Sequence, residues 1–156
     1  MTGSSRRLPP LAWVGLCLLG QHRIAGRRRT SPWSATLAGA IAAASLGLLG
    51  WAVSGFRRHD TTVDPLEPAR AAHLVTEGAF GVTRNPMYVA MTGVLVSHAV
   101  ARRSLLAFLP AVAFAAFMDR TQIQVEESVM RAKFGADWDR YAANTPRWLS
   151  ARPIAR

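Results

Sequence analysis

The feature that most constrains this chain is an uncharged run from Trp33 to Phe56. It holds 24 consecutive residues without an acidic or basic side chain, most of them Ala, Gly and Leu. A helix needs about 20 mostly apolar residues to cross the hydrocarbon core of a bilayer, so the run predicts a membrane-spanning helix. Its small side chains between Ala38 and Gly47 predict a surface on which another helix packs closely in lipid.

A shorter apolar run, Leu8 to Gly20, lies behind Arg6 and Arg7 near the N-terminus. A basic start and a short apolar core are also typical of a secretory signal peptide. The residues that follow are polar and basic and contain no small-x-small cleavage site. We therefore interpret this run as an uncleaved, short membrane helix.

Two more apolar runs, Met87 to Ala101 and Ser104 to Met118, are separated by Arg102 and Arg103. Each holds 15 residues, which is short for a perpendicular span. With a few flanking residues, the two runs predict a tight helical hairpin that turns at the arginine pair. The alternative is one bent element that lies in the membrane interface without crossing.

The remaining segments are polar. Arg57 to Asn85 combines proline, glycine and mixed charge, which predicts a structured loop. Asp119 to Phe134 predicts an amphipathic helix that Gly135 ends, and Asp137 to Trp148 predicts a last short helix and turn. No segment has the alternation that is typical of a strand.

Together these elements predict an all-α fold, an integral-membrane helical bundle of about four transmembrane helices. We expect one domain over residues 1–156. Its N-terminal helices occupy residues 1–56, and its motif-bearing core occupies residues 57–149.

The charge pattern points to a membrane. The formal net charge is +10, from 19 basic and 9 acidic residues, and 50% of the chain is hydrophobic. The arginines flank the apolar runs and form no stripe with interleaved aromatic residues, which argues against nucleic acid as a partner. The middle loop and the tail carry most of the basic residues, which predicts that both lie in the cytoplasm. We expect a multi-pass protein of a bacterial inner membrane. The cluster Arg27, Arg28 and Arg29 opposes that orientation.

We expect neither a metal site nor a disulfide within one chain. Cys17 is the one cysteine, and the four histidines are scattered without the spacing of metal ligands. All nine acidic residues lie between Asp60 and Asp139. The polar chemistry therefore belongs to the middle loop, the tail and the adjoining helix ends.

Three stretches of that region stand out: Leu74 to Tyr88, the pair Glu126 and Glu127, and Phe134 to Leu149. Each also has an ordinary structural explanation. An arginine or a tyrosine at the end of a membrane helix often anchors the helix at the membrane–water interface. Glu127 and Arg131 have the i, i+4 spacing of a surface ion pair. Residue types alone do not decide between a functional site and these structural roles.

In their order and residue identities, these stretches resemble motifs of the isoprenylcysteine carboxyl methyltransferase and phospholipid N-methyltransferase family of small integral-membrane enzymes. The resemblance covers roughly residues 57 to 149 and includes a hairpin of the right size. It is carried by Thr61-Thr62-Val63-Asp64-Pro65, Leu74-Val75, Gly78-Ala79-Phe80, Arg84-Asn85-Pro86-Met87-Tyr88, Glu126-Glu127, Met130, Phe134-Gly135, Trp138, Tyr141 and Pro146-Arg147-Trp148. Two residues depart from the family pattern: Ala79 replaces the usual proline, and Asn85 replaces the commoner histidine.

The resemblance implies transfer of a methyl group from S-adenosylmethionine, bound by the cytoplasmic loop and the C-terminal helix. Carboxylates suit the amino group or the ribose hydroxyls of this donor, and an arginine suits its carboxylate. The implied cofactor-binding residues are Gly78, Phe80, Gly81, Arg84, Asn85, Pro86, Tyr88, Glu126 and Glu127. The implied catalytic or acceptor-binding residues are Arg84, Tyr88, Arg140 and Arg147. Whether Arg84 meets the glutamates through a bound donor or through a direct salt bridge stays open at this point.

The implied acceptor is lipid-like: a prenylated cysteine carboxylate, a phospholipid amine or another small hydrophobic molecule. A carboxylate is already a nucleophile, whereas a protonated amine must first lose a proton, which a nearby carboxylate favours. Two other functions are compatible with the residues. One is a membrane NADPH-dependent reductase with a similar Arg-x-Pro-x-Tyr mouth, although that group commonly has Asn where Met87 stands. The other is a non-catalytic membrane scaffold.

Overall fold

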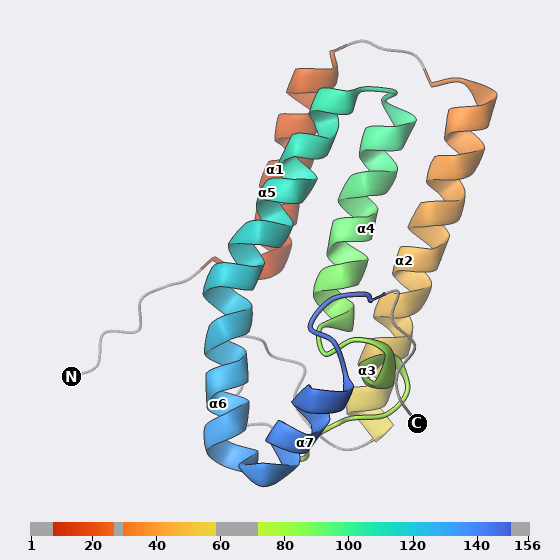
Figure 1. Cartoon of the computed structure of the whole chain (residues 1–156). Coiled ribbons are helices and arrows are strands. Elements are labelled where there is room, and N and C mark those ends of the chain that lie inside the picture. Colours follow the sequence, from red (N-terminus) through yellow and green to blue (C-terminus); the bar gives the residue numbers. More distant parts are fainter. Residues whose placement is uncertain (1–7, 27–29, 59–71, 151–156) are drawn as a thin grey trace.

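The computed structural model describes residues 8–26, 30–58 and 72–150 (Figure 1). No strand occurs within these ranges, so the all-α prediction is confirmed. The motif at Thr61–Pro65 and the cluster Arg27–Arg29 lie outside them. The elements in chain order are α1 (Pro10–Ala25), α2 (Pro32–Arg58), α3 (Ala79–Val82), α4 (Pro86–Ala101), the 3₁₀ turn η2 (Leu105–Ala107), α5 (Phe108–Met118), the π-helical turn η3 (Asp119–Ile123), α6 (Gln124–Phe134) and α7 (Ala136–Asn144).

Two of the described helices are long and apolar enough to cross a membrane. One is α2, with 27 residues, and the other is the continuous helix Leu105–Phe134, with 30. α2 buries little of its surface and exposes large side chains such as Trp33, Leu37 and Leu46. A helix that is apolar on all sides is typical of a membrane span. α4 is apolar but shorter, at 16 residues.

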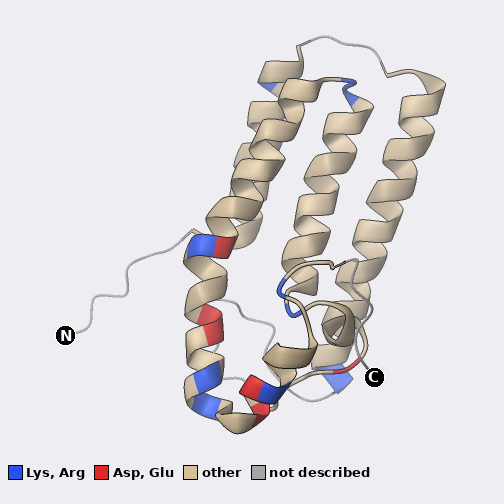
Figure 2. Ribbon diagram, viewed as in Figure 1, with Lys and Arg blue, Asp and Glu red and all other residues tan. Residues whose placement is uncertain are grey.

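The long helix changes character at Met118, where its apolar residues end. Asp119 and Arg120 follow at once, in the π-helical turn. We treat the part up to Met118 as membrane-spanning and the charged part, α6, as an extension beyond it (Figure 2). α6 is thereby presented rigidly from the end of the bundle, since no loop interrupts the helix.

α2 and α4 pack closely through small residues, as the sequence predicts. A Cβ atom built on Gly93 of α4 would lie only 2.1 Å from Oγ of Ser45 on α2. One turn further along α4, the Ser97 hydroxyl donates a hydrogen bond to the Ala38 carbonyl at 2.8 Å. Backbones that approach this closely leave room only for glycine, alanine and serine at the crossing.

α1 begins at Pro10, within the predicted segment Leu8 to Gly20, and continues beyond that segment to Ala25. Its 16 residues are fewer than the about 20 of a full span. Gln21 is fully buried, and its amide nitrogen donates to the carbonyls of Leu95 at 2.9 Å and Ala107 at 2.7 Å. Its amide oxygen lies 3.0 Å from Nδ1 of His98. α1 is thus attached to α4 and to the start of α5 by a satisfied polar group.

The predicted hairpin between α4 and α5 is confirmed. Arg103 adopts a left-handed backbone conformation with φ 51°, which allows the chain to reverse direction there. Beside it, the Arg102 guanidinium donates to the Gly26 carbonyl at the end of α1. This turn lies at the end of the bundle remote from α6 and α7 (Figure 1).

The described acidic residues all lie toward the opposite end of the bundle (Figure 2). Gly135, with φ 51°, ends α6 where the sequence predicts it. The chain then turns back, so that α7 and the tail after it lie against the beginning of α4 (Figure 1). α3, a single helical turn within the predicted loop, completes this end.

Candidate functional site

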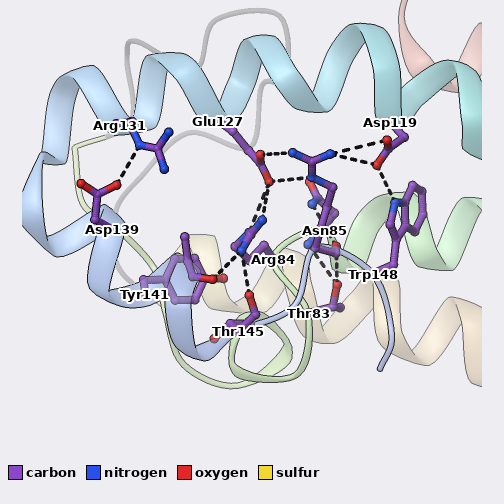
Figure 3. A network of polar contacts seen from close by, with 12 residues as sticks. Thr83, Arg84, Asn85, Asp119, Glu127, Arg131, Asp139, Tyr141, Thr145 and Trp148 are labelled. Carbon is purple, nitrogen blue, oxygen red and sulfur yellow. Dashed lines mark hydrogen bonds and ion pairs between the residues drawn. The ribbon is translucent and has the colours of Figure 1, made fainter. Parts of the chain in front are cut away.

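The centre of the site is the Glu127 carboxylate on α6, which two guanidinium groups contact (Figure 3). Arg84, just before α4, donates to Oε1 from Nη2 at 2.9 Å and from Nε at 3.3 Å. Arg147, in the tail, donates to the same oxygen from Nε at 3.0 Å and to Oε2 from Nη2. The Glu127 side chain is 17% exposed, and that of Arg84 is 13% exposed, so the group is shielded from water but not closed off. In the structure, Arg84 therefore meets a glutamate by a direct salt bridge.

Arg84 also fixes the end of α7. Its Nη1 donates to the carbonyls of Ala142 at 2.7 Å and Thr145 at 2.9 Å. Carbonyls at a helix C-terminus carry partial negative charge, which a cation stabilises. The guanidinium carbon also lies 5.9 Å from the ring centroid of Trp138. Arg84 therefore joins three elements: the start of α4, α6 and α7.

The segment before α4 pairs with the tail. The Arg84 amide donates to the Pro146 carbonyl at 2.9 Å. The Thr83 hydroxyl and the Asn85 side-chain amide both donate to the Arg147 carbonyl, at 2.9 and 3.0 Å. Asn85 therefore acts here as a hydrogen-bond donor, a role that a histidine N–H also performs. The departure from the family pattern at this position is chemically conservative.

Asp119 extends the network toward the bundle. It forms an ion pair with Nη1 of Arg147 at 3.3 Å, and it accepts a hydrogen bond from Nε1 of Trp148 at 2.8 Å. In the sequence, Asp119 differs from other acidic residues only by its position at the end of an apolar run. The sequence gives no reason to single it out, because its partner is 28 residues away and belongs to a different element.

Glu126 is adjacent to Glu127 but has different partners. Its Oε1 accepts hydrogen bonds from the Tyr88 hydroxyl at 2.6 Å and from the Gln122 amide at 3.0 Å. No basic side chain of the described ranges forms an ion pair with it. Consecutive helical residues point about 100° apart, which places the two carboxylates on different sides of α6.

The two carboxylates differ in acidity for this reason. Burial raises the pKa of Glu126 to about 7, although the hydrogen bonds from Tyr88 and Gln122 act to lower it. Burial also acts to raise the pKa of Glu127. Hydrogen bonds from Arg147 and Arg84 outweigh that effect, so the pKa of Glu127 lies below its ordinary value. Both groups lie beyond the membrane-spanning part of their helix.

The predicted residues Gly78, Phe80 and Gly81 lie at α3, against α2 and α7. Gly78 has φ 61°, and a Cβ there would lie 3.1 Å from Nε1 of Trp51. The Phe80 carbonyl accepts a hydrogen bond from the Tyr141 hydroxyl at 2.8 Å. The close contact with Trp51 gives Gly78 a packing role that the sequence does not reveal.

The structure brings together only some of the predicted residues. Arg84, Glu127 and Arg147 share one network, and Tyr88 with Glu126 forms the contact beside it. Pro86 is buried at the first position of α4, where its missing N–H costs no hydrogen bond.

Arg140 is not part of this network. It is 73% exposed and pairs with Asp137 on the outside of α7, so its predicted contact with an acidic acceptor stays a prediction. Arg131 pairs with Asp139 at 2.7 Å, and therefore does not form the i, i+4 pair with Glu127 that the spacing allows.

Comparisons with known proteins agree with the resemblance. A family model described as phospholipid methyltransferase matches residues 33–137. The match includes α2, which the motifs leave out, and stops before the Pro146-Arg147-Trp148 segment. No curated protein and no solved structure matches the chain.

Proposed function

Because this chain belongs to the phospholipid methyltransferase family, we propose that it transfers a methyl group from S-adenosylmethionine to a lipid acceptor at the charged end of its bundle. The family and the two apolar helices make it a membrane methyltransferase. One observation supports the proposal that S-adenosylmethionine binds at this end: Arg84 and Arg147 share the half-buried Glu127 carboxylate at the edge of the membrane-spanning part.

The donor fits this site as a zwitterion. Its amino group is a cation that can replace a guanidinium on Glu127. Its carboxylate is an anion that the released guanidinium can bind bidentately. The exchange conserves charge, so no buried charge is left unpaired. Arg147 is the candidate for release, since its side chain is 32% exposed, against 13% for Arg84, and Arg84 has two further backbone partners.

The bound donor supplies a methyl group on a sulfonium, which is already an electrophile. The residues of this chain then have to hold the acceptor in line with that methyl group, and orientation alone contributes several kcal/mol to such reactions. Tyr88 and Glu126 lie beside the network, at the point where α4 emerges from the bundle. This position supports a contact between these two residues and the reacting end of an acceptor.

A groove between α4 and α5 suits the hydrocarbon part of that acceptor. It has a volume of about 520 Å³ and ends at the polar residues Asp119, Arg120 and Trp148. Its side walls are apolar or small and lie at membrane depth. A lipid tail in the groove would bring its headgroup to Asp119, which belongs to the network. The residues along it are Thr92 and Val96 of α4 and Phe108, Ala111, Val112, Ala115 and Ala116 of α5.

Binding of S-adenosylmethionine to the detergent-purified protein tests the proposal. We expect calorimetry to detect binding by the wild type, and Glu127→Gln to weaken it by about 10- to 100-fold, since a hydrogen bond to a charged group contributes about 1.5–3 kcal/mol. The matched control is Asp139→Asn, which removes an exposed carboxylate that pairs only with Arg131 in the described structure. Folded wild-type protein that binds no S-adenosylmethionine would overturn the proposal. Equal loss in the control would show that Glu127 has no special role.

A further inference from the structure

A second concentration of positive charge lies around the turn between α4 and α5, at the end of the bundle remote from Glu127. Arg23 lies on the last turn of α1 at this end, and Arg102 and Arg103 form the turn itself. The acidic residues of the described ranges all lie toward the other end (Figure 2). The basic groups at this turn are therefore remote from the carboxylates of the charged end.

Arg102 has fewer partners than a half-buried guanidinium needs. In the described structure its side chain forms one hydrogen bond, from Nη2 to the Gly26 carbonyl, and no ion pair. Its Nε atom is buried and has no hydrogen-bond partner there. A guanidinium has five N–H donors, and native structures rarely leave a buried donor without a partner, because its desolvation is costly. Arg102 therefore lacks both hydrogen-bond acceptors and a counter-charge.

The surroundings of Arg102 fix its position and add to the positive potential. Its amide donates to the His98 carbonyl at 3.0 Å, and the contact of His98 with Gln21 joins this turn of α4 to α1. Arg103 follows, exposed and with a left-handed backbone. The long helix Leu105–Phe134 begins two residues later, and the N-terminus of a helix carries partial positive charge that favours anions. The turn therefore presents several positive groups that are held by the fold.

An exposed apolar surface begins directly beside these arginines. Leu105 is 87% exposed, and Leu106 and Leu109 are exposed as well. Spacings of three and four residues place both of the first two next to Leu109 on the helix surface. The three leucines belong to the membrane-spanning part, where they meet acyl chains, and Arg102 and Arg103 lie just outside it, at the level of lipid headgroups. A charged group followed by hydrocarbon has the same order as a lipid molecule.

We propose that the turn at Arg102 and Arg103 binds the phosphate group of an anionic lipid, whose acyl chains lie along Leu105, Leu106 and Leu109. This site is separate from the groove assigned to the acceptor, because none of these five residues lines that groove. The inference is also independent of the proposed function, since the bound lipid stabilises the bundle and is not a substrate.

Cations at helix C-termini also stabilise the helix dipole, which is an ordinary explanation for arginines at the ends of α1 and α4. The hydrogen bond from Arg102 to the Gly26 carbonyl fulfils that role. It does not explain the buried Nε without a partner or the exposed leucines beside the turn. A lipid phosphate beside the guanidinium supplies the missing counter-charge, and its chains cover the leucines.

The test measures lipid binding by the full-length protein after lipid has been removed in a neutral detergent. The probes are dioleoyl phosphatidylglycerol, which is anionic, dioleoyl phosphatidylcholine, which has the same chains and no net charge, and inorganic phosphate, which has no chains. Native mass spectrometry counts the bound lipid. The unfolding temperature provides a second readout, because a ligand that binds only the folded state raises it.

We expect the wild type to bind phosphatidylglycerol at least tenfold more tightly than phosphatidylcholine. Arg102→Gln removes a charge-assisted hydrogen bond and should weaken phosphatidylglycerol binding by about tenfold. Arg103→Asn should weaken it by about threefold, and Asn tolerates the left-handed backbone at this position. Arg58→Gln is the matched control, because it removes one exposed charge from the other end of the bundle, at the end of α2. It should leave lipid binding unchanged.

Three results would overturn the inference. One is a wild type that binds the two lipids equally. Another is a rise in unfolding temperature with inorganic phosphate as large as with phosphatidylglycerol, which would assign the turn to free anions. The third is a loss of binding in Arg58→Gln as large as in Arg102→Gln, which would indicate general charge attraction. If Arg102→Gln does not fold, Arg103→Asn decides, since it keeps the Gly26 contact, and unchanged phosphatidylglycerol binding in that variant also contradicts the site.

Discussion

In the membrane-spanning part of the bundle, the polar side chains bind mainly backbone carbonyls, whereas at the charged end acidic and basic side chains also bind one another. Gln21 and Ser97 belong to the first group, and their partners are carbonyls of neighbouring helices. Glu127, Arg84 and Arg147 belong to the second. A backbone carbonyl in lipid has no alternative partner, so such bonds hold helices together. Charged side chains at the membrane edge can exchange partners with a ligand, so the second region is the one suited to chemistry.

The largest effect expected is that of Arg84→Ala, because this residue belongs to both structure and site. The change removes one of the two arginine partners of Glu127, and it removes the Arg84 donor from the carbonyls of Ala142 and Thr145 at the end of α7. Breaking a largely buried ion pair costs about 3–5 kcal/mol, which corresponds to a fall of about 10 °C or more in unfolding temperature for a chain of this size. Thermal unfolding in detergent would measure it, with the exposed Arg131→Ala as control. An unchanged unfolding temperature would show that the network does not join α7 to α4.

The second-largest effect is expected for Gly93→Ala, which should lower stability in the membrane-spanning part without changing the charged end. Gly93→Ala places a Cβ atom at 2.1 Å from the Ser45 hydroxyl, far inside van der Waals contact. Overpacking of this kind costs about 1–3 kcal/mol, and Ser45→Gly in the same chain should restore much of the loss. Because the crossing is remote from Glu127, we expect S-adenosylmethionine affinity to stay the same while the unfolding temperature falls. A parallel loss of donor affinity would mean that the bundle and the charged end are coupled.

The same contrast explains what could be predicted from the sequence. The helices, the turn at Arg102 and Arg103, and the end of α6 at Gly135 follow from apolar length and from local backbone preferences, and the structure confirms them. The partners of Arg84 could not be predicted from spacing, because its contacts to Glu127 and Thr145 depend on how α7 folds back. The sequence also favours Glu127 with Arg131, and the structure replaces that local pair with long-range ones.

A third change, Tyr88→Phe, acts on Glu126 in a direction that can be stated in advance. The Tyr88 hydrogen bond lowers the pKa of Glu126 and partly opposes the effect of burial. Removing the hydroxyl should therefore raise the pKa of Glu126 above about 7, which the infrared band of its protonated carboxyl measures. Tyr141→Phe is the control, because its hydroxyl donates to the Phe80 carbonyl and not to Glu126. A downward shift of this pKa, or an equal shift in the control, would contradict the stabilisation of the ionised Glu126 by the Tyr88 hydrogen bond.

The smallest effect concerns the groove between α4 and α5. Ala115→Leu adds three carbons to its wall, whereas Ala113→Leu adds the same three carbons on the exposed side of α5, outside the groove. If the acceptor's hydrocarbon chain lies there, Ala115→Leu should raise KM for the lipid by about tenfold, as expected for 1–3 kcal/mol of overpacking. Donor affinity and unfolding temperature should match those of Ala113→Leu. Because the two variants share helix propensity and hydrophobicity, a KM that rises equally in both would place the lipid chain elsewhere on the bundle. A KM that changes only in Ala115→Leu would connect the membrane-facing half of the molecule to the charged end through the substrate itself.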